Sequence, residues 1–402
     1  MAGSDLSVYV HLPLCPSRCH YCDFYSETVA CQELKSTGAR LVDRILADTE
    51  AWLESPYLDH PGGYRVTTVY LGGGSPTYFG AETLGGLLTG LERRLPTVPE
   101  TEWSVESHPV DLTPEVVEVL EGSEVNRLSL GVQSFEPETL RLIGRRDPEA
   151  SEPDALGRTL RGWSGTISVD LIGERPGQSA AGLRRDITAA VSLGARHVSV
   201  YPLSWPDESP GGKPDPRERL GYPEFDAWEV AEKTLGDAGF LRYEVSNFAR
   251  SGFECRHSLA YWRMAPYVGI GPGAVGTLPY PTESRGEERW TLRASGIQPV
   301  AAYLRATETP AITLETQSKK KALFERLMMG LRLTEGLSLE AIGREFGKDA
   351  LGRVAAVIRP YLDDGLLEEV ALFGGSDHRL RCLPAGRLRL DEVLRGIINL
   401  MD

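Results

Sequence analysis

The run CPSRCHYCDF, residues 15–24, decides the fold of this chain. It places Cys15, Cys19 and Cys22 at offsets of four and three, although the chain has only 6 cysteines among 402 residues. In a reducing compartment, closely spaced cysteines are more often metal ligands than disulfide partners. Pro16 disfavours a regular helix through the first interval, so we expect a loop that wraps around a metal centre.

Two kinds of metal centre fit this spacing. Structural zinc normally takes four protein ligands, and the nearby His11 and His20 lack the paired spacing that is usual for zinc. An iron–sulfur cubane held by three cysteines instead leaves one iron open to a non-protein ligand. The spacing therefore favours a cluster over zinc, with a chance grouping of inert thiols as the third alternative.

Short apolar runs alternate with helix-like segments from residue 7 to about residue 275. The predicted strands are residues 7–12, 66–73, 102–107, 126–132, 166–173 and 197–203. Their cores are nearly continuous in Val, Leu, Ile and Tyr, which is typical of strands buried on both faces. In the first predicted helix, Leu41, Ile45 and Trp52 share one side at helical spacing. Six βα units in series predict an α/β fold with a parallel sheet, either open or curved into a partial barrel.

Unusual residues follow the predicted strands one after another. In chain order they are the cysteine run, residues 72–77, Glu106, Gln133, Asp170 and Ser204. In folds of this class, ligands bind at the carboxyl ends of the strands. The sequence therefore predicts a single active rim that these residues share.

The texture of the chain changes near residue 280. The stretch PYPTESRGEERW, residues 279–290, is polar and rich in turn formers, so we expect a loop. Helical runs and a hairpin pattern follow from about residue 318, and they predict a small winged-helix-like α+β domain. We expect a first domain at 1–280, a linker at 281–316 and a C-terminal domain at 317–402.

Charge and hydropathy limit the location and the partners of the chain. A net charge of -14 argues against a nucleic-acid partner, which normally requires a basic face. No stretch approaches eighteen consecutive apolar residues, so we expect no transmembrane segment. The N-terminus lacks a basic region followed by an apolar run, so we expect a cytoplasmic protein.

Five ordered blocks resemble one known family. They are VYVHLPLCPSRCHYCDF, YLGGGSPT, RLSLGVQSF, DLIGERPGQ and YEVSNFARSGFECRHSLAYW. The blocks resemble the oxygen-independent coproporphyrinogen III oxidase-like branch of the radical S-adenosylmethionine (SAM) superfamily. The resemblance implies a radical SAM barrel in which Cys15, Cys19 and Cys22 hold a [4Fe-4S] cluster. It also implies that SAM binds the open iron, where an electron from the cluster cleaves its sulfonium to a radical.

The resemblance also assigns cofactor contacts residue by residue. For a first SAM molecule these are Tyr9, Tyr21, Gly73, Gly74, Ser75 and Glu106. In the oxidases, the positions that match Gln133, Arg145 and Asp170 contact a second SAM molecule. Core packing remains the alternative role for both tyrosines, and a tight strand-to-helix turn is the alternative for the glycine run. For Glu106 the alternative is a helix-capping or salt-bridged rim residue, and for Gln133, Arg145 and Asp170 it is an ordinary polar position at the rim.

Departures from the oxidase pattern shape the expected function. The oxidases continue their motif with Cys-x-Cys, whereas Phe24 stands here, as in the heme-chaperone-like branch. That branch has the motif His-Asn-x-x-Tyr-Trp, in which His257 is the candidate heme ligand and Ser258 replaces the Asn. A third departure is GERPGQ, residues 173–178, which places charges on the loop after Asp170.

The resemblance therefore implies a chaperone that binds heme, or a porphyrin-type ligand, and transfers it to heme-accepting proteins. An electron donor such as flavodoxin or ferredoxin would serve the cluster. Enzyme activity stays open, either as a coproporphyrinogen III oxidase or as a methyltransferase or cyclase on another substrate. A zinc-stabilised binding protein is the remaining alternative.

Overall fold

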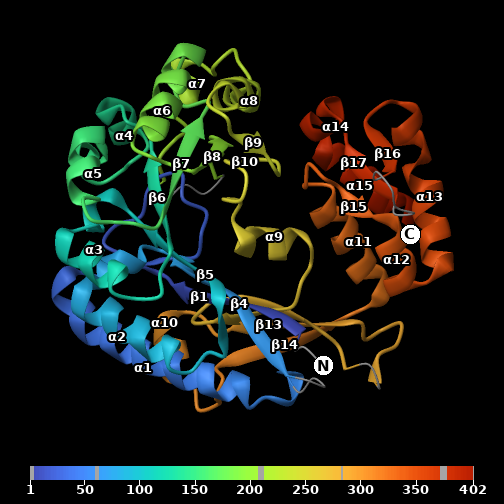
Figure 1. Cartoon of the computed structure of the whole chain (residues 1–402), viewed down its shortest axis with the longest axis horizontal. Helices are drawn as coiled ribbons and strands as arrows, with labels where there is room; N and C mark the ends of the chain where they lie inside the picture. Colours follow the sequence, from blue (N-terminus) through green and yellow to red (C-terminus); the bar gives the residue numbers. More distant parts are fainter. Residues whose placement is uncertain (1–3, 59–62, 207–211, 282–283, 372–377, 402) are drawn as a thin grey trace.

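A parallel sheet forms the centre of the computed structural model, which describes residues 4–58, 63–206, 212–281, 284–371 and 378–401 (Figure 1). In chain order its strands are β1 (Ser4–Leu12), β4 (Tyr64–Gly73), β5 (Thr97–Ser107), β6 (Arg127–Gln133), β7 (Thr166–Gly173) and β8 (His197–Pro202). Each strand pairs in parallel with the next one in this series. The predicted strands and their order are therefore confirmed, with most boundaries shifted by a few residues.

Shorter strands extend the sheet on both sides. Within the described residues it is a 12-stranded sheet of order β14-β13-β12-β11-β1-β4-β5-β6-β7-β8-β10-β9. The added strands are β11 (Tyr267–Ile270), β12 (Val275–Pro279), β13 (Thr291–Gly296), β14 (Ile312–Gln317), β10 (Asn247–Ala249) and β9 (Leu241–Arg242). Strand β11 is parallel to β1, and the others pair antiparallel. The sheet curves into a partial barrel, as the family resemblance implies.

Helices cover the outer face of this sheet, as Figure 1 shows for α1 to α6. The helices of this part of the chain are α1 (Cys31–Leu53), α2 (Gly80–Glu92), α3 (Pro114–Glu121), α4 (Pro137–Leu142), α5 (Pro153–Thr159), α6 (Ala180–Ser192), α7 (Arg217–Leu220), α8 (Ala227–Asp237), α9 (Arg256–Trp262) and α10 (Val300–Tyr303). Helix α9 is not on the outer face, because its His257 contacts Thr68 and Tyr70 on the inner side of β4. Leu41, Ile45 and Trp52 of α1 are buried in the main core, so the predicted apolar face of this helix is confirmed.

The two faces of the central strands differ in chemistry. In β6, Leu128 and Leu130 are buried in the core under the helices, whereas Ser129 lines a cavity inside the barrel. In β7, Leu171 lies in the same core and Asp170 faces the cavity. Side chains alternate between the faces of a strand, so these runs place an apolar side outward and a polar side inward. The strands are therefore buried on both faces, as the sequence predicts, but their inner face is polar.

The segment predicted as a linker, 281–316, is mostly part of the sheet. Residues 282–283 lie outside the described residues, but β13, α10 and most of β14 fall within the segment. Ala294, Val300 and Tyr303 are buried in the main core. The prediction of a loop is therefore wrong beyond residue 290. Edge strands are short and carry small or polar residues, which makes them hard to distinguish from loop in a sequence.

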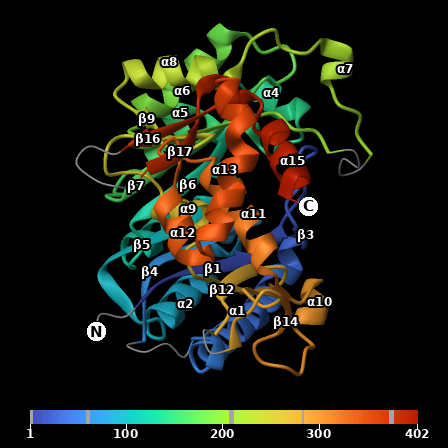
Figure 2. The same cartoon turned by 90° about the vertical axis from the view of Figure 1, so that its right-hand side faces the viewer.

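The C-terminal unit has its own core and packs beside the barrel (Figure 2). It contains α11 (Lys319–Gly330), β15 (Leu337–Ser338), α12 (Leu339–Phe346), α13 (Lys348–Asp363), β16 (Leu367–Ala371), β17 (His378–Cys382), α14 (Pro384–Leu388) and α15 (Leu390–Met401). Its sheet has the order β15-β17-β16, which fits the predicted winged-helix-like arrangement. Glu244 forms a β-bridge to Leu333, and Trp290 stacks on Phe346 at 5.5 Å between ring centroids. These contacts join the C-terminal unit to the barrel.

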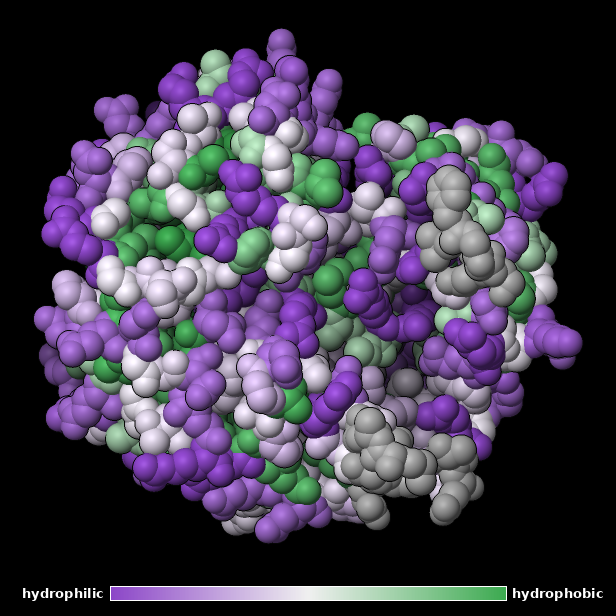
Figure 3. Space-filling view, viewed as in Figure 1, coloured by the Kyte–Doolittle hydropathy of each residue, from purple (hydrophilic) through white to green (hydrophobic). Residues whose placement is uncertain are grey.

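The described helices include none that is long and apolar enough to span a membrane. Polar side chains cover most of the face seen in Figure 3, with apolar ones scattered among them.

Candidate cofactor site

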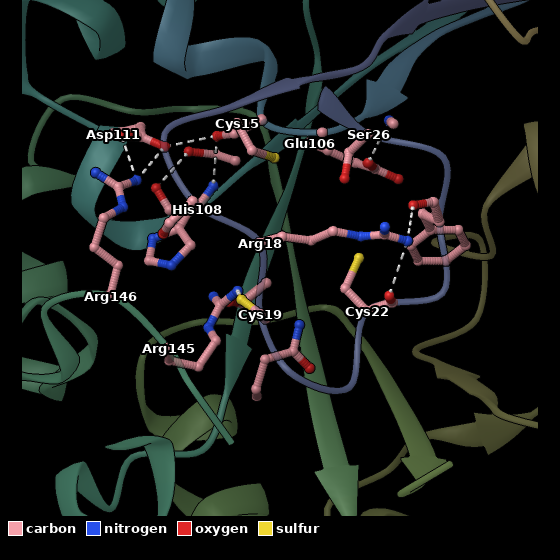
Figure 4. A pocket seen from close by; sticks show the side chains of 18 of the residues that line it. Cys15, Arg18, Cys19, Cys22, Ser26, Glu106, His108, Asp111, Arg145 and Arg146 are labelled. Carbon is pink, nitrogen blue, oxygen red and sulfur yellow. Dashed lines mark hydrogen bonds and ion pairs between the residues drawn. The ribbon is translucent and has the colours of Figure 1, made fainter. Parts of the chain in front are cut away.

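The cysteine run forms a loop at the carboxyl end of the barrel (Figure 4). Cys15 ends β2 (Leu14–Cys15), which pairs with β3 (Glu27–Thr28) and closes the base of the loop. The N–H of Cys22 donates to the carbonyl of Cys19 at 3.2 Å. Arg18 spans the loop and donates to the carbonyls of Cys22 and Phe24 at 3.3 and 3.2 Å. The chain thus folds as the wrapping loop that Pro16 predicts.

All three cysteines line one open cavity with an empty volume of about 920 Å³. The cavity also receives the carboxyl ends of the strands, as the sequence predicts. From the predicted site residues it gathers Tyr21, Gly73, Gly74, Ser75, Glu106, Gln133, Arg145 and Asp170. Phe24 lines its rim with 73% of its surface exposed. Tyr9 and His257 do not belong to its lining.

The thiols of Cys15, Cys19 and Cys22 line the same cavity. Within the described part of the chain, no group of three or more His, Cys, Asp or Glu side chains is placed to hold a metal ion. Burial raises the pKa of Cys15 to about 12 and also raises the pKa of Cys22. Because metals bind thiolates, loading of this site must release protons.

The glycine run after β4 lets other groups approach closely. A Cβ on Gly72 would lie 2.9 Å from the Glu106 carboxylate, and one on Gly74 would lie 2.6 Å from the Leu14 carbonyl oxygen and 3.0 Å from Cys15 Sγ. Gly73 has φ +113°, and a Cβ there would lie 2.5 Å from the His11 ring. Gly74 therefore lets the backbone pack closely against Leu14 and Cys15, where a side chain would clash.

Ser75 is held by a series of hydrogen bonds through residues that the sequence analysis did not single out. The Ser75 hydroxyl donates to Asp111 Oδ2 at 2.8 Å, and Arg146 donates to both Asp111 oxygens at 2.7 and 2.8 Å. All three residues line the cavity, and Figure 4 shows Arg146 beside Asp111. Asp111 follows strand β5 by four residues. The expectation that functional residues follow the carboxyl ends of the strands could therefore have identified it. Arg146 had no such signal apart from its neighbour Arg145.

Glu106 is the penultimate residue of β5 and lines the cavity. Its carboxylate accepts the Tyr70 hydroxyl at 2.8 Å and the Gly73 N–H at 3.1 Å. Burial raises the pKa of Glu106 to about 7, the two hydrogen bonds oppose that rise, and nearby Asp170 adds to it. Glu106 can therefore bind a proton, a hydroxyl or an ammonium near neutral pH.

Arg145, Gln133 and Asp170 converge on the side of the cavity nearest Cys19. Arg145 Nη1 lies 3.8 Å from Cys19 Sγ, and its other terminal nitrogen donates to the Gly131 carbonyl. Asp170 accepts the Ser129 hydroxyl at 3.1 Å, and burial raises its pKa. The Arg145 guanidinium thus places positive charge beside a cysteine that would carry negative charge as a ligand.

Tyr9 and His257 belong to an aromatic group outside this cavity. The Tyr9 hydroxyl and His11 Nδ1 lie 2.7 Å apart, and the Tyr9 and His257 ring centroids are separated by 6.2 Å. The His257 ring stacks on Tyr70 at 5.1 Å and shares a hydrogen bond with Thr68 at 2.8 Å. It is only 4% exposed, and burial lowers its pKa to about 3. In this conformation His257 is therefore a neutral, buried ring.

Glu102 fixes the helix that carries His257. Its carboxylate accepts the N–H groups of Arg256 and His257, at 3.1 and 3.0 Å, in the first turn of α9. Cys255 Sγ lies 3.7 Å from the same carboxylate. A carboxylate at the N-terminus of a helix satisfies free N–H groups and complements the helix dipole. The sequence analysis did not single out Glu102.

A second, inner cavity adjoins the first and shares Glu106, Gln133 and Asp170 with it. Its empty volume is about 830 Å³, and polar side chains from β6, β7 and β8 line it. Arg127 is 4% exposed, donates to the Phe253 carbonyl at 3.0 Å, and lies 4.0 Å from Glu102. Its Nη2 is buried without a hydrogen-bond partner.

The charged loop GERPGQ has a structural role. Arg175 is fully buried, forms an ion pair with Asp186, and donates through Nε to the Ile172 carbonyl at 2.8 Å. Asp186 also accepts the N–H of Phe135 at 2.9 Å, which ties this loop to the loop after β6. Glu174 accepts the N–H of Ala227 at 3.0 Å. These charges therefore hold neighbouring loops of the rim together.

Comparison with known proteins agrees with this geometry. The model of the radical SAM superfamily matches residues 9–152. A Mycobacterium tuberculosis protein named heme chaperone HemW is 33% identical over 406 aligned positions, covering 99% of this chain and 96% of its own. A Lactococcus lactis protein of the same name is 32% identical, covering 85% of each chain. The chain belongs to the HemW family of radical SAM proteins.

Solved structures identify the same fold. The coproporphyrinogen III oxidase HemN from Escherichia coli, a radical SAM enzyme, matches with a TM-score of 0.74 at 20% identity. The match covers 100% of this chain and 90% of HemN. The model of the HemN C-terminal domain matches residues 317–389. The partial barrel and the C-terminal unit are therefore both features of this fold.

The residues present fit the cofactors of a radical SAM domain, a [4Fe-4S] cluster and SAM. Cys15, Cys19 and Cys22 would hold the cluster, because all three border one cavity. Gly74 and Glu106 would then border the space for SAM. When bound, the cluster supplies one-electron reduction of the SAM sulfonium. The chain itself contributes the thiolates, the Arg145 charge beside Cys19, and a carboxyl that titrates near neutral pH.

Proposed function

We propose that this protein binds heme and transfers it to heme-requiring acceptor proteins. The observation that supports this most strongly is the similarity over nearly the whole chain to proteins named heme chaperone HemW. The cofactor cavity would assist through cluster and SAM binding, served by a cytoplasmic electron donor such as flavodoxin or ferredoxin. Tyr21, Gly73, Gly74, Ser75 and Glu106 would contact SAM, and all five line that cavity.

The structure supports the remaining residue roles that the resemblance implies to different degrees. Gln133, Arg145 and Asp170 line the cavity and could contact a second SAM molecule. Tyr9 would act on the cofactor only indirectly, through the aromatic group around Tyr70. Ligation of heme by His257 would require α9 to move, because the ring is buried in this conformation.

Phe24 argues against oxidative decarboxylation of a porphyrinogen. This chain has the three cysteines of the radical SAM motif, but the oxidases that it resembles have a further cysteine where Phe24 stands. Phe24 is largely exposed at the rim of the cavity, so a porphyrin-type ligand could cover it.

A second candidate function is a radical reaction on a small polar substrate. The inner cavity favours it, because it adjoins the cofactor cavity and is lined by polar side chains together with the buried Arg127. A buried guanidinium with an unused N–H is suited to bind a carboxylate. Consumption of SAM in the presence of a carboxylate substrate would support this function over the chaperone.

Hemin titration tests the proposed function. The protein is reconstituted with iron and sulfide without oxygen, titrated with hemin, and followed through the Soret band. Saturable binding near one equivalent, followed by heme transfer to an apo-acceptor, is the expected result. Absence of saturable binding would contradict the proposal. A His257→Ala variant in parallel decides whether His257 is a ligand, because only then should binding weaken.

A further inference from the structure

A groove between the barrel and the C-terminal unit combines positive charge with an apolar wall. Two adjoining cavities share Arg332, Asp391 and Arg395, and together we call them the interdomain groove. One part reaches Trp228 of the barrel helix α8, and the other lies between α11 and α15. Figure 1 shows α14 and α15 on the side of the C-terminal unit that faces α8.

The groove has more arginines than acids, because four arginines line it together with the carboxylates of Asp391 and Glu392. Arg389 is paired with Glu392 at 2.6 Å, but Arg332, Arg387 and Arg395 form no comparable pair among the described residues. Arg387 has Glu232 at 3.8 Å, beyond hydrogen-bond distance, and its Nε is buried without a partner.

The Arg332 guanidinium is also partly removed from water. It donates to the Met328 carbonyl, and burial lowers its pKa although Asp391 and Glu244 oppose that change. A cation that has lost water without gaining a paired carboxylate is stabilised by an incoming anion. The groove therefore presents unpaired positive charge in a chain whose net charge is -14.

The other wall of the groove is apolar. Phe324 and Met328 of α11 face Leu394 and Ile398 of α15 across it. On the basic side, Leu388 is 63% exposed beside Arg387. An exposed apolar surface next to several arginines is suited to a ligand that is apolar over most of its area and anionic at one edge.

We propose that the interdomain groove binds heme, with its propionates on Arg332, Arg387 and Arg395 and its macrocycle against the apolar wall. The proposal rests on the proposed heme-binding function and gives it a location. Heme is a flat apolar ring with two carboxylates at one edge, so its chemistry complements both walls. The planar guanidinium of arginine can donate two hydrogen bonds to one carboxylate. The site would be separate from the cofactor cavity and from His257.

Esterified heme provides the test. Wild type and the double variant Arg332→Gln, Arg395→Gln are titrated with hemin and with hemin dimethyl ester, whose propionates carry no charge. The wild type should prefer hemin, and the double variant should bind hemin at least about tenfold more weakly with little change for the ester. The control Arg353→Gln changes an exposed arginine of α13 outside the groove and should match the wild type.

The outcomes separate the two proposals. Saturable hemin binding that the double variant leaves unchanged would overturn the groove while the chaperone function stands. Absence of saturable binding by the wild type would overturn both. If the double variant does not fold, Arg395→Gln alone decides, because Arg395 is exposed and its loss should still weaken hemin binding several-fold relative to the ester.

Discussion

Single residues set the chemistry of the cofactor cavity, and Glu106 shows how. Its strand delivers the carboxyl to the rim, and burial brings its pKa to about 7. Glu106 and the cluster cysteines could be placed on the rim from the sequence, because each follows an apolar run. The shift in pKa could not, because it arises chiefly from burial of the carboxyl, which outweighs the opposing hydrogen bonds from Tyr70 and Gly73 and which only the fold creates.

The pKa of Glu106 predicts a pH dependence of SAM binding. If SAM donates hydrogen bonds to Glu106, it binds the ionised form, which increases as pH rises through about 7. Affinity in the reconstituted protein should therefore tighten about tenfold between pH 6 and pH 8. Calorimetric titration of wild type and Glu106→Gln measures this. SAM titrates equally in both proteins, so an equal pH dependence in the variant would contradict the role of Glu106.

Gly73 should tolerate no side chain. Gly73→Ala imposes φ +113° on an L-residue and brings its Cβ within 2.5 Å of His11, so it should cost about 2 kcal/mol or more of unfolding free energy. The matched control is Gly86→Ala on α2, where a Cβ meets open space and should be neutral or stabilise by up to about 1 kcal/mol. Urea unfolding compares them, and equal stabilities would show that Gly73 is not constrained.

At the scale of elements, periodicity predicted the strands but not the two chemistries of their faces. Residues 128–132 (LSLGV) and 168–172 (SVDLI) alternate apolar and polar side chains. This two-residue period could have predicted the polar interior of the barrel. Strand β13 and the edge strand β14 could not be predicted, because small and polar residues dominate them. The capping of α9 was also hidden, because Glu102 lies about 150 residues away in the sequence.

Removal of the Glu102 charge should loosen α9. Glu102→Gln keeps the shape but weakens the acceptor for two N–H groups and removes the counter-charge of Arg127, so we expect a loss of about 1–3 kcal/mol. Hydrogen exchange should accelerate first in residues 256–262. The exposed Glu118→Gln on α3 is the control and should change stability by less than about 0.5 kcal/mol. Unchanged exchange in α9 would contradict the capping role.

At the scale of the whole molecule, the chain carries two apolar cores. The sequence predicted the start of the C-terminal unit near residue 317 from the new helical pattern. It did not reveal that the preceding segment completes the main sheet. Nor could it reveal the interdomain groove, because the arginines on that groove come from three separate elements and look like ordinary surface charges in the sequence.

Two cores predict unfolding in more than one step. The contacts between the units include exposed ion pairs such as Arg263–Glu335, which couple them weakly. Calorimetry should therefore give a van't Hoff enthalpy smaller than the calorimetric enthalpy. Hydrogen exchange at rising urea should release the amides of α11 to α15 separately from those of the barrel. One transition with coincident release of all amides would contradict this.

Electron paramagnetic resonance of the reduced, reconstituted protein, with and without SAM, tests the central claim most directly. The account predicts about four irons and four sulfides per chain, and a cluster signal that changes when SAM binds the iron that no cysteine holds. Cys15→Ala, Cys19→Ala and Cys22→Ala should each lose that signal, whereas Cys31→Ala, at an exposed cysteine outside the cavity, should keep it. Bound zinc in place of iron, or a signal that SAM leaves unchanged, would contradict the account.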